Sequence, residues 1–153
     1  MMKNFLFLIT LIGLNAGCSS QINDIKSLEV EFDGGKNEFY KKYNLWNTFT
    51  DKSLINKIVT SIDTSENIFN CPPHRPVMWE IDVYAKDEKD KSKHLFKIGS
   101  NTYNKLSLWK GELCYNNDSL IQMMMELMRV EEIKKFQGEM SQSDYDIILQ
   151  RDR

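Results

Sequence analysis

Two histidines and three cysteines are the side chains of this 153-residue chain best suited to catalysis or metal binding. His74 and His94 do not stand in the H-E-x-x-H spacing that turns two imidazoles toward one zinc ion. No G-x-S-x-G element is present to expose a nucleophilic serine, and no glycine-rich loop leads into a helix to bind phosphate. We therefore predict no catalytic residues, no metal and no cofactor, and expect a protein that is not an enzyme.

Two further groups of side chains have both a chemical and a structural interpretation. Residues 123–128 hold four methionines, whose thioethers bind copper(I), but their helical spacing is typical of a helix packed on a core. Glu29 and Glu31 alternate along one expected strand, and Glu80 and Asp82 along another, so two of them face each other if the strands are neighbours. Alternation on a solvent-exposed face explains the same carboxylates without catalysis, and we prefer that interpretation.

The first residues carry the pattern of an exported protein. Lys3 precedes an unbroken apolar run, Phe5–Leu14, which would rise about 15 Å as a helix. That length is too short for a hydrocarbon core of about 30 Å and matches the central part of a signal peptide. Two small residues, Ala16 and Gly17, then precede Cys18. We therefore predict a signal peptide at residues 1–17 and a polar tether, beginning with a lipidated cysteine, at residues 18–26.

The run Asn15–Cys18 resembles the lipobox of bacterial lipoproteins, in which the cysteine receives a lipid and becomes the first residue after cleavage. The resemblance covers residues 1–18 only, and Asn15 stands where the family usually has leucine. It implies lipidation of Cys18, contact with the membrane through that lipid, and a place in the cell envelope. Ser19 favours the outer membrane, facing the periplasm, if the cell is Gram-negative. Ordinary secretion without a lipid is the main alternative, and a buried N-terminal helix of a cytosolic protein is a further one.

With Cys18 used for the lipid, Cys71 and Cys114 are an even pair in an exported chain, which favours a disulfide between them. The bond would close a loop of about 43 residues and, in the chain-entropy model, stabilise the fold by about 4 kcal/mol. The alternatives are two separate buried thiols or a redox pair. A redox pair normally has the C-x-x-C spacing, which these cysteines lack.

The residues after Cys71 form a stiff, basic run that is our candidate binding loop. Its members are Pro72, Pro73, His74, Arg75 and Pro76. A rigid backbone reduces the entropy lost on binding, so such a run suits recognition. A surface loop shaped by its prolines and the disulfide is the simpler interpretation of the same residues.

Apolar periodicity predicts the secondary structure that would hold these residues. Strands are expected at Ser27–Asp33, Met78–Ala85 and His94–Ile98, with an extended segment inside Glu38–Phe49. Leu106–Leu113 is expected to be a further strand or a hairpin about Lys110–Gly111. Helices are expected from Thr50 or Asp51 to Ile62 and from Asn117 or Asp118 to Phe136, and a proline-bearing loop at Asp63–Pro76. The prediction is one α+β domain, residues 27–136: a small antiparallel sheet of about four to five strands with two helices packed on one face. Residues 137–153 are predicted to be a weakly ordered C-terminal tail, with a short docked turn formed by Tyr145, Ile147, Ile148 and Leu149 as the alternative.

The net charge of the chain argues against a nucleic-acid partner. The formal charge is −2 at pH 7 and basic residues are mixed with acidic ones, so we expect no nucleic-acid binding. We expect a lipid-anchored, non-enzymatic protein-binding module, comparable in size and address to exported inhibitors and immunity proteins, whose partner is another envelope or exported protein. The candidate interface aromatics are Tyr40, Tyr43, Trp46 and Tyr84. A structural or accessory envelope lipoprotein, or a small hydrolase or metal-binding protein, are the alternatives.

Overall fold

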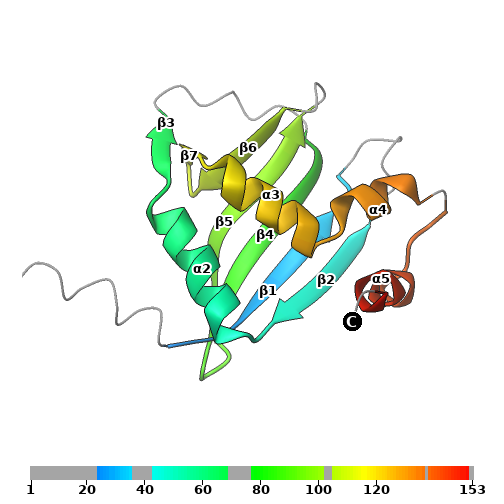
Figure 1. Ribbon diagram of the computed structural model, residues 1–153, viewed down its shortest axis with the longest axis horizontal. Coiled ribbons are helices and arrows are strands. Elements are labelled where there is room, and N and C mark those ends of the chain that lie inside the picture. The colour runs from blue at the N-terminus through cyan, green and yellow to red at the C-terminus, as the bar shows by residue number, and fades with distance from the viewer. Residues whose placement is uncertain (1–23, 36–42, 69–76, 102–104, 137, 152–153) are drawn as a thin grey trace, which may run out of the picture.

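The computed structural model describes residues 24–35, 43–68, 77–101, 105–136 and 138–151. These residues form one antiparallel sheet of seven strands with helices against one side (Figure 1). The predicted α+β class and antiparallel sheet are confirmed, whereas the expected number of four to five strands is too low. None of the described helices is long and apolar enough to cross a lipid bilayer.

Each strand of the sheet runs antiparallel to its neighbours, in the spatial order β2-β1-β4-β5-β6-β7-β3. The strands are β1 (Ile25–Asp33), β2 (Asn44–Phe49), β3 (Glu66–Ile68), β4 (Val77–Asp87), β5 (Ser92–Asn101), β6 (Leu106–Lys110) and β7 (Leu113–Asn116). Short β3 lies within the segment predicted to be a loop. The prolines of that segment restrict only their own surroundings, from Cys71 onward, so residues 66–68 are free to pair with β7.

Strands β1 and β4 show the alternation that the sequence predicts. On the helix side their apolar side chains are buried in directly opposed pairs: Leu28–Ala85, Val30–Val83 and Phe32–Ile81. Burying each larger aliphatic or aromatic side chain stabilises the fold by about 1.5–3 kcal/mol relative to exposure. A shift of one residue in register would expose this whole row, so the pairing of β1 with β4 is strongly specified.

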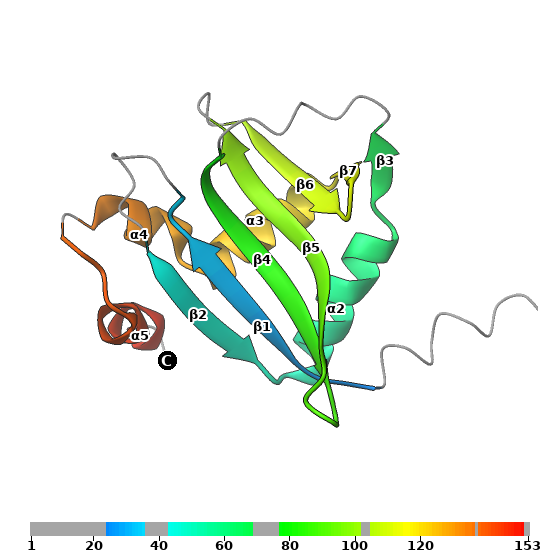
Figure 2. The same cartoon turned by 180° about the vertical axis from the view of Figure 1, so that it is seen from behind.

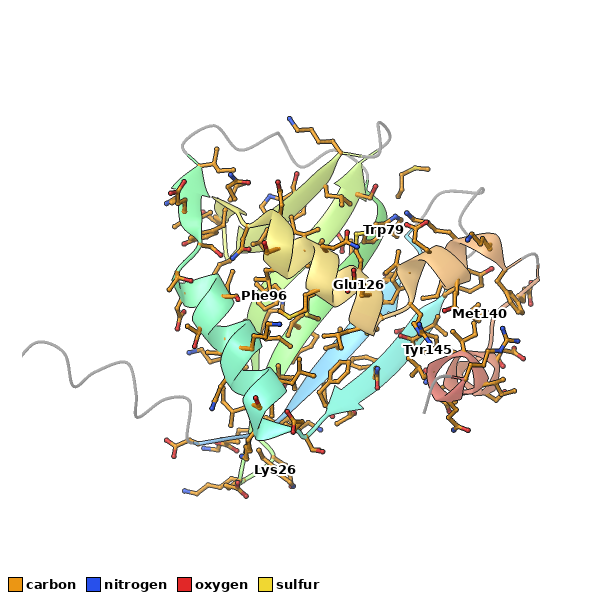
Figure 3. All side chains as sticks on the ribbon, viewed as in Figure 1. Lys26, Trp79, Phe96, Glu126, Met140 and Tyr145 are labelled. Carbon is orange, nitrogen blue, oxygen red and sulfur yellow. The ribbon has the colours of Figure 1, made fainter. Side chains whose placement is uncertain are left out.

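Two capped helices cover the apolar side of the sheet. Helix α2 (Lys52–Asp63) begins after Asp51, whose carboxylate accepts the Leu54 N–H at 2.7 Å. Helix α3 (Asp118–Leu127) begins after Asn117, whose side-chain oxygen accepts the Leu120 N–H at 2.9 Å. These contacts satisfy backbone donors that a helix start leaves free. Phe96 of β5 is buried among the side chains beneath these helices (Figure 3).

The single helix predicted up to Phe136 is wrong, because the chain turns after α3. Arg129 adopts a left-handed backbone with φ 55°, and a separate helix, α4 (Val130–Lys135), follows it. Met128 and Val130 are both fully buried. In one continuous helix, residues two apart point to nearly opposite sides, so the turn at Arg129 is what lets both side chains enter the core.

The segment predicted to be a weakly ordered tail, residues 137–153, contains a fourth described helix, α5 (Gln142–Gln150). Ser141 and Asp144 close its first turn in a reciprocal capping box. Tyr145 is fully buried, and its hydroxyl donates to the Met128 carbonyl at 2.9 Å (Figure 3). The described chain therefore has four helices instead of the two expected. The division into signal, tether and one domain stays a prediction.

Candidate functional site

The side of the sheet that faces away from the helices is lined by charged and aromatic side chains. Seen from this side, strands β2, β1, β4 and β5 lie in front, and no helix of the described chain crosses them (Figure 2). We call this surface the open face. By strand register it includes Asn44, Trp46, Thr48, Glu29, Glu31, Asp33, Glu80, Asp82, Tyr84, Lys86, His94 and Lys97.

A row of three rings crosses the open face from β2 to β5. Trp46 stacks on Tyr84 with ring centroids 6.3 Å apart, and Tyr84 meets the His94 ring edge-on at 5.2 Å. Strand β1 lies between β2 and β4, whose backbones are therefore about 9–10 Å apart. The Trp46 and Tyr84 rings thus lean toward each other over β1. Trp46, at the outer end of the row, is 40% exposed.

Ion pairs order the other end of the open face. The Lys97 Nζ lies 2.7 Å from Glu80 Oε2 and 3.6 Å from Asp82 Oδ2, while His94 Nε2 lies 2.9 Å from Asp82 Oδ1. Burial alone would lower the pKa of Lys97, but the hydrogen bond to Glu80 and the charges of Glu80 and Asp82 outweigh it and raise that pKa. Lys97 is therefore held in its charged form.

Carboxylates of like charge oppose each other between β1 and β4. Glu31 lies directly opposite Asp82, and Asp33 directly opposite Glu80. Partial burial, followed by the charges of Asp82 and Asp33, raises the pKa of Glu31. Opposed like charges destabilise a strand pair. With five carboxylates against two lysines and His94 neutral, the open face has a formal charge of −3 and would be stabilised by a cationic surface laid on it.

The residues predicted to be functional from the sequence are only partly placed. Cys114 lies in β7, is 1% exposed and is disulfide-bonded. Cys18, Cys71 and the candidate binding loop, Pro72–Pro76, lie outside the described residues. The pairing of Cys114 with Cys71 therefore stays a prediction.

The four candidate interface aromatics are also only partly placed on the open face. Trp46 is exposed and Tyr84 is half-buried on the open face, whereas Tyr43 is buried and its hydroxyl donates to the Gly138 carbonyl at 2.7 Å. Tyr40 lies outside the described residues. The predicted opposition of the β1 and β4 carboxylates is confirmed. Lys97 was not singled out from the sequence, because only the register of β4 with β5 brings it to Glu80 and Asp82.

The described residues offer little for hydrolysis or metal binding. No group of three or more histidine, cysteine or carboxylate side chains in this part of the chain could hold a metal ion. The His94–Asp82 contact has the form of a base and its orienting carboxylate, but no described serine, threonine or cysteine hydrogen-bonds to His94. Within the described ranges, the His94–Asp82 pair therefore has no nucleophile beside it.

No protein-family model, curated protein or solved structure shows detectable similarity to this chain.

Proposed function

We propose that the chain is a non-enzymatic protein-binding module of the cell envelope, comparable to an inhibitor or immunity protein, that binds a cationic surface of another envelope or exported protein with its open face. The observation that carries the proposal is the exposed Trp46, stacked on Tyr84 above an acidic strand. Tryptophan and tyrosine are among the residues that contribute most to protein–protein binding, since they bury large rigid surfaces at low entropy cost.

The charges on the open face support a cationic partner. The opposed pairs Glu31–Asp82 and Asp33–Glu80 cost stability in the free protein, and a lysine or arginine placed between them would relieve that cost. Association with such a partner would be faster at low ionic strength, because the acidic face attracts it over about one Debye length.

The N-terminal sequence pattern supports a location in the cell envelope. The apolar run and the cysteine at residues 5–18 are those of an exported lipoprotein, and a disulfide-bonded Cys114 fits an oxidising compartment. We infer that a lipid on Cys18 holds the module at the membrane. An accessory role through α3 receives no comparable support, because its exposed side chains, Asp118, Ser119, Gln122 and Glu126, are polar.

Site-directed photocrosslinking on intact cells tests the proposal. A photoreactive amino acid at Thr48, exposed on the open face, should yield one crosslinked partner, and the same amino acid at Lys57, exposed on α2, should not. Trp46→Ala should weaken capture about tenfold or more if Trp46 is a hot spot. Ile147→Ala, which removes an apolar side chain 57% exposed on α5, is the matched control and should leave capture unchanged. Equal capture from Thr48 and Lys57 would overturn the proposal.

A further inference from the structure

A groove with a volume of about 640 Å³ opens on the helix side of the sheet, between α2 and the β4–β5 hairpin. Its floor is apolar, with Val59 and Ile62 from α2, Ala85 from β4 and Leu95 from β5. The size lies within the range of pockets that take small organic ligands. The groove opens on the helix side of the sheet, although two residues of the open face, Lys86 and His94, also line it.

Lys93 occupies an unusual place at the edge of this floor. Strand register sets it directly opposite Ala85, in the row of β5 side chains that faces the helices. Further along the same row Phe96 and Ile98 are fully buried. Lys93 instead is exposed and makes no ion pair with any residue that the structure describes. The charged side chain of Lys93 thus lies at the solvent-exposed edge of the apolar floor.

The other charges around the groove are largely paired. The Lys110 Nζ lies 2.8 Å from Asp63 Oδ1, and the Lys86 Nζ lies 2.5 Å from Glu29 Oε1. One carboxylate oxygen of Asp87 accepts two backbone N–H groups within the hairpin turn. Asp24 stands at the mouth of the groove without an ion pair among the described residues. The positive charge available to a ligand therefore comes from Lys93 and, beside it, from Lys91.

We propose that this groove binds a single-chain amphiphile with an anionic head group, of the fatty-acid class. The alkyl chain would lie on Val59, Ile62, Ala85 and Leu95, and the carboxylate would meet Lys93. Burial of an alkyl chain on an apolar floor supplies the main favourable free energy, and a single charge pair at the open end fixes its direction. The ligand would lie on the helix side of the sheet and the protein partner on the opposite side, with Lys86 and His94 shared by the two linings.

Photolabelling with a dodecanoic acid that carries a diazirine on its chain tests the assignment on the full chain. We expect adducts on peptides that contain Val59–Ile62 or Lys93–Leu95, found by mass spectrometry. A probe with the same chain and a trimethylammonium head should label these peptides about tenfold less, since Lys93 would repel it.

Variants separate the role of Lys93 from that of overall charge. Lys93→Glu should reduce labelling by the fatty acid about tenfold, and Lys93→Arg should retain it. Lys89→Glu makes the same charge change on the same hairpin, outside the groove, and should label like the unaltered protein. Thermal unfolding of each variant shows that it is folded. Equal labelling by both probes, or adducts confined to other peptides, would overturn the proposal.

Discussion

The side-chain amide of Gln142 makes both hydrogen bonds that a neighbouring strand would make to the backbone of Trp46. The Trp46 N–H donates to Gln142 Oε1 at 2.8 Å, and Gln142 Nε2 donates to the Trp46 carbonyl at 2.9 Å. Strand β2 is an edge of the sheet, and its free backbone groups would otherwise be open to pairing with another chain. One glutamine of α5 thus protects the edge and holds the strand that presents the Trp46 ring.

Removal of this contact should loosen the edge of β2. We expect Gln142→Ala to lower the free energy of unfolding by about 1 kcal/mol, because two hydrogen bonds at an exposed site are exchanged for water. The Trp46 amide should exchange with deuterium faster than in the unaltered protein, and self-association should increase. The control is Gln150→Ala, which removes an exposed glutamine from the end of the same helix. Unchanged exchange at Trp46 would show that α5 does not close this edge.

Glu31 should make the stability of the protein depend on pH in a definite direction. Its pKa in the folded protein is raised by partial burial and by the charges of Asp82 and Asp33. A raised carboxyl pKa means that the folded state binds the proton more tightly than the unfolded state. The free energy of unfolding therefore falls as pH rises from the ordinary glutamate value, about 4.3, through the higher folded value.

The Glu31→Gln variant keeps the shape of the side chain and removes this titration. We expect its melting temperature to match that of the unaltered protein near about pH 4 and to exceed it near about pH 7. Salt at about 1 M should shrink the difference without abolishing it, because screening weakens the like charges and leaves the burial of Glu31 unaffected. If Glu31→Gln were less stable than the unaltered protein at neutral pH, this would contradict the conclusion that the charged form of Glu31 destabilises the folded protein.

Tyr145 should connect the C-terminal helix to the end of α3. Its hydroxyl is buried and donates to the carbonyl of Met128, one of the acceptors that a helix end leaves unpaired. Tyr145→Phe should lower the free energy of unfolding by about 1–2 kcal/mol, since a buried acceptor loses its donor. Tyr115→Phe is the control, because that half-buried hydroxyl bonds to no residue in the described part of the chain. Equal effects of the two changes would exclude the proposed connection.

Local patterns in the sequence predict much of the fold. Alternation in residues 27–33 identifies which side of β1 is buried, and Asp51 and Asn117 cap helices because short polar side chains suit that position. The turn at Arg129 was missed because nothing local forbids a continuous helix there. It follows from the need to bury both Met128 and Val130, which only the packed structure imposes.

The candidate site could be predicted only in part for the same reason. Residue type identifies Trp46 and Tyr84 as interface candidates, but their stacking depends on β2 and β4 lying on either side of β1. The contact between Gln142 and Trp46 joins residues far apart in the chain and has no local signal. Residue types therefore suggested the members of the open face, and strand order was needed to bring them together.

The disulfide offers a test of both the predicted pairing and the predicted lipid. Cys114 is bonded and buried, and the prediction assigns Cys71 as its partner. Replacing both cysteines by alanine should lower the free energy of unfolding by about 4 kcal/mol in the chain-entropy model, measured by urea unfolding. Cys18→Ala is the control and should leave that free energy unchanged while releasing the protein from the membrane. A non-reduced digest that joins Cys114 to Cys18 would refute both predictions together, because a cysteine thiol that carries a lipid is not available for a disulfide.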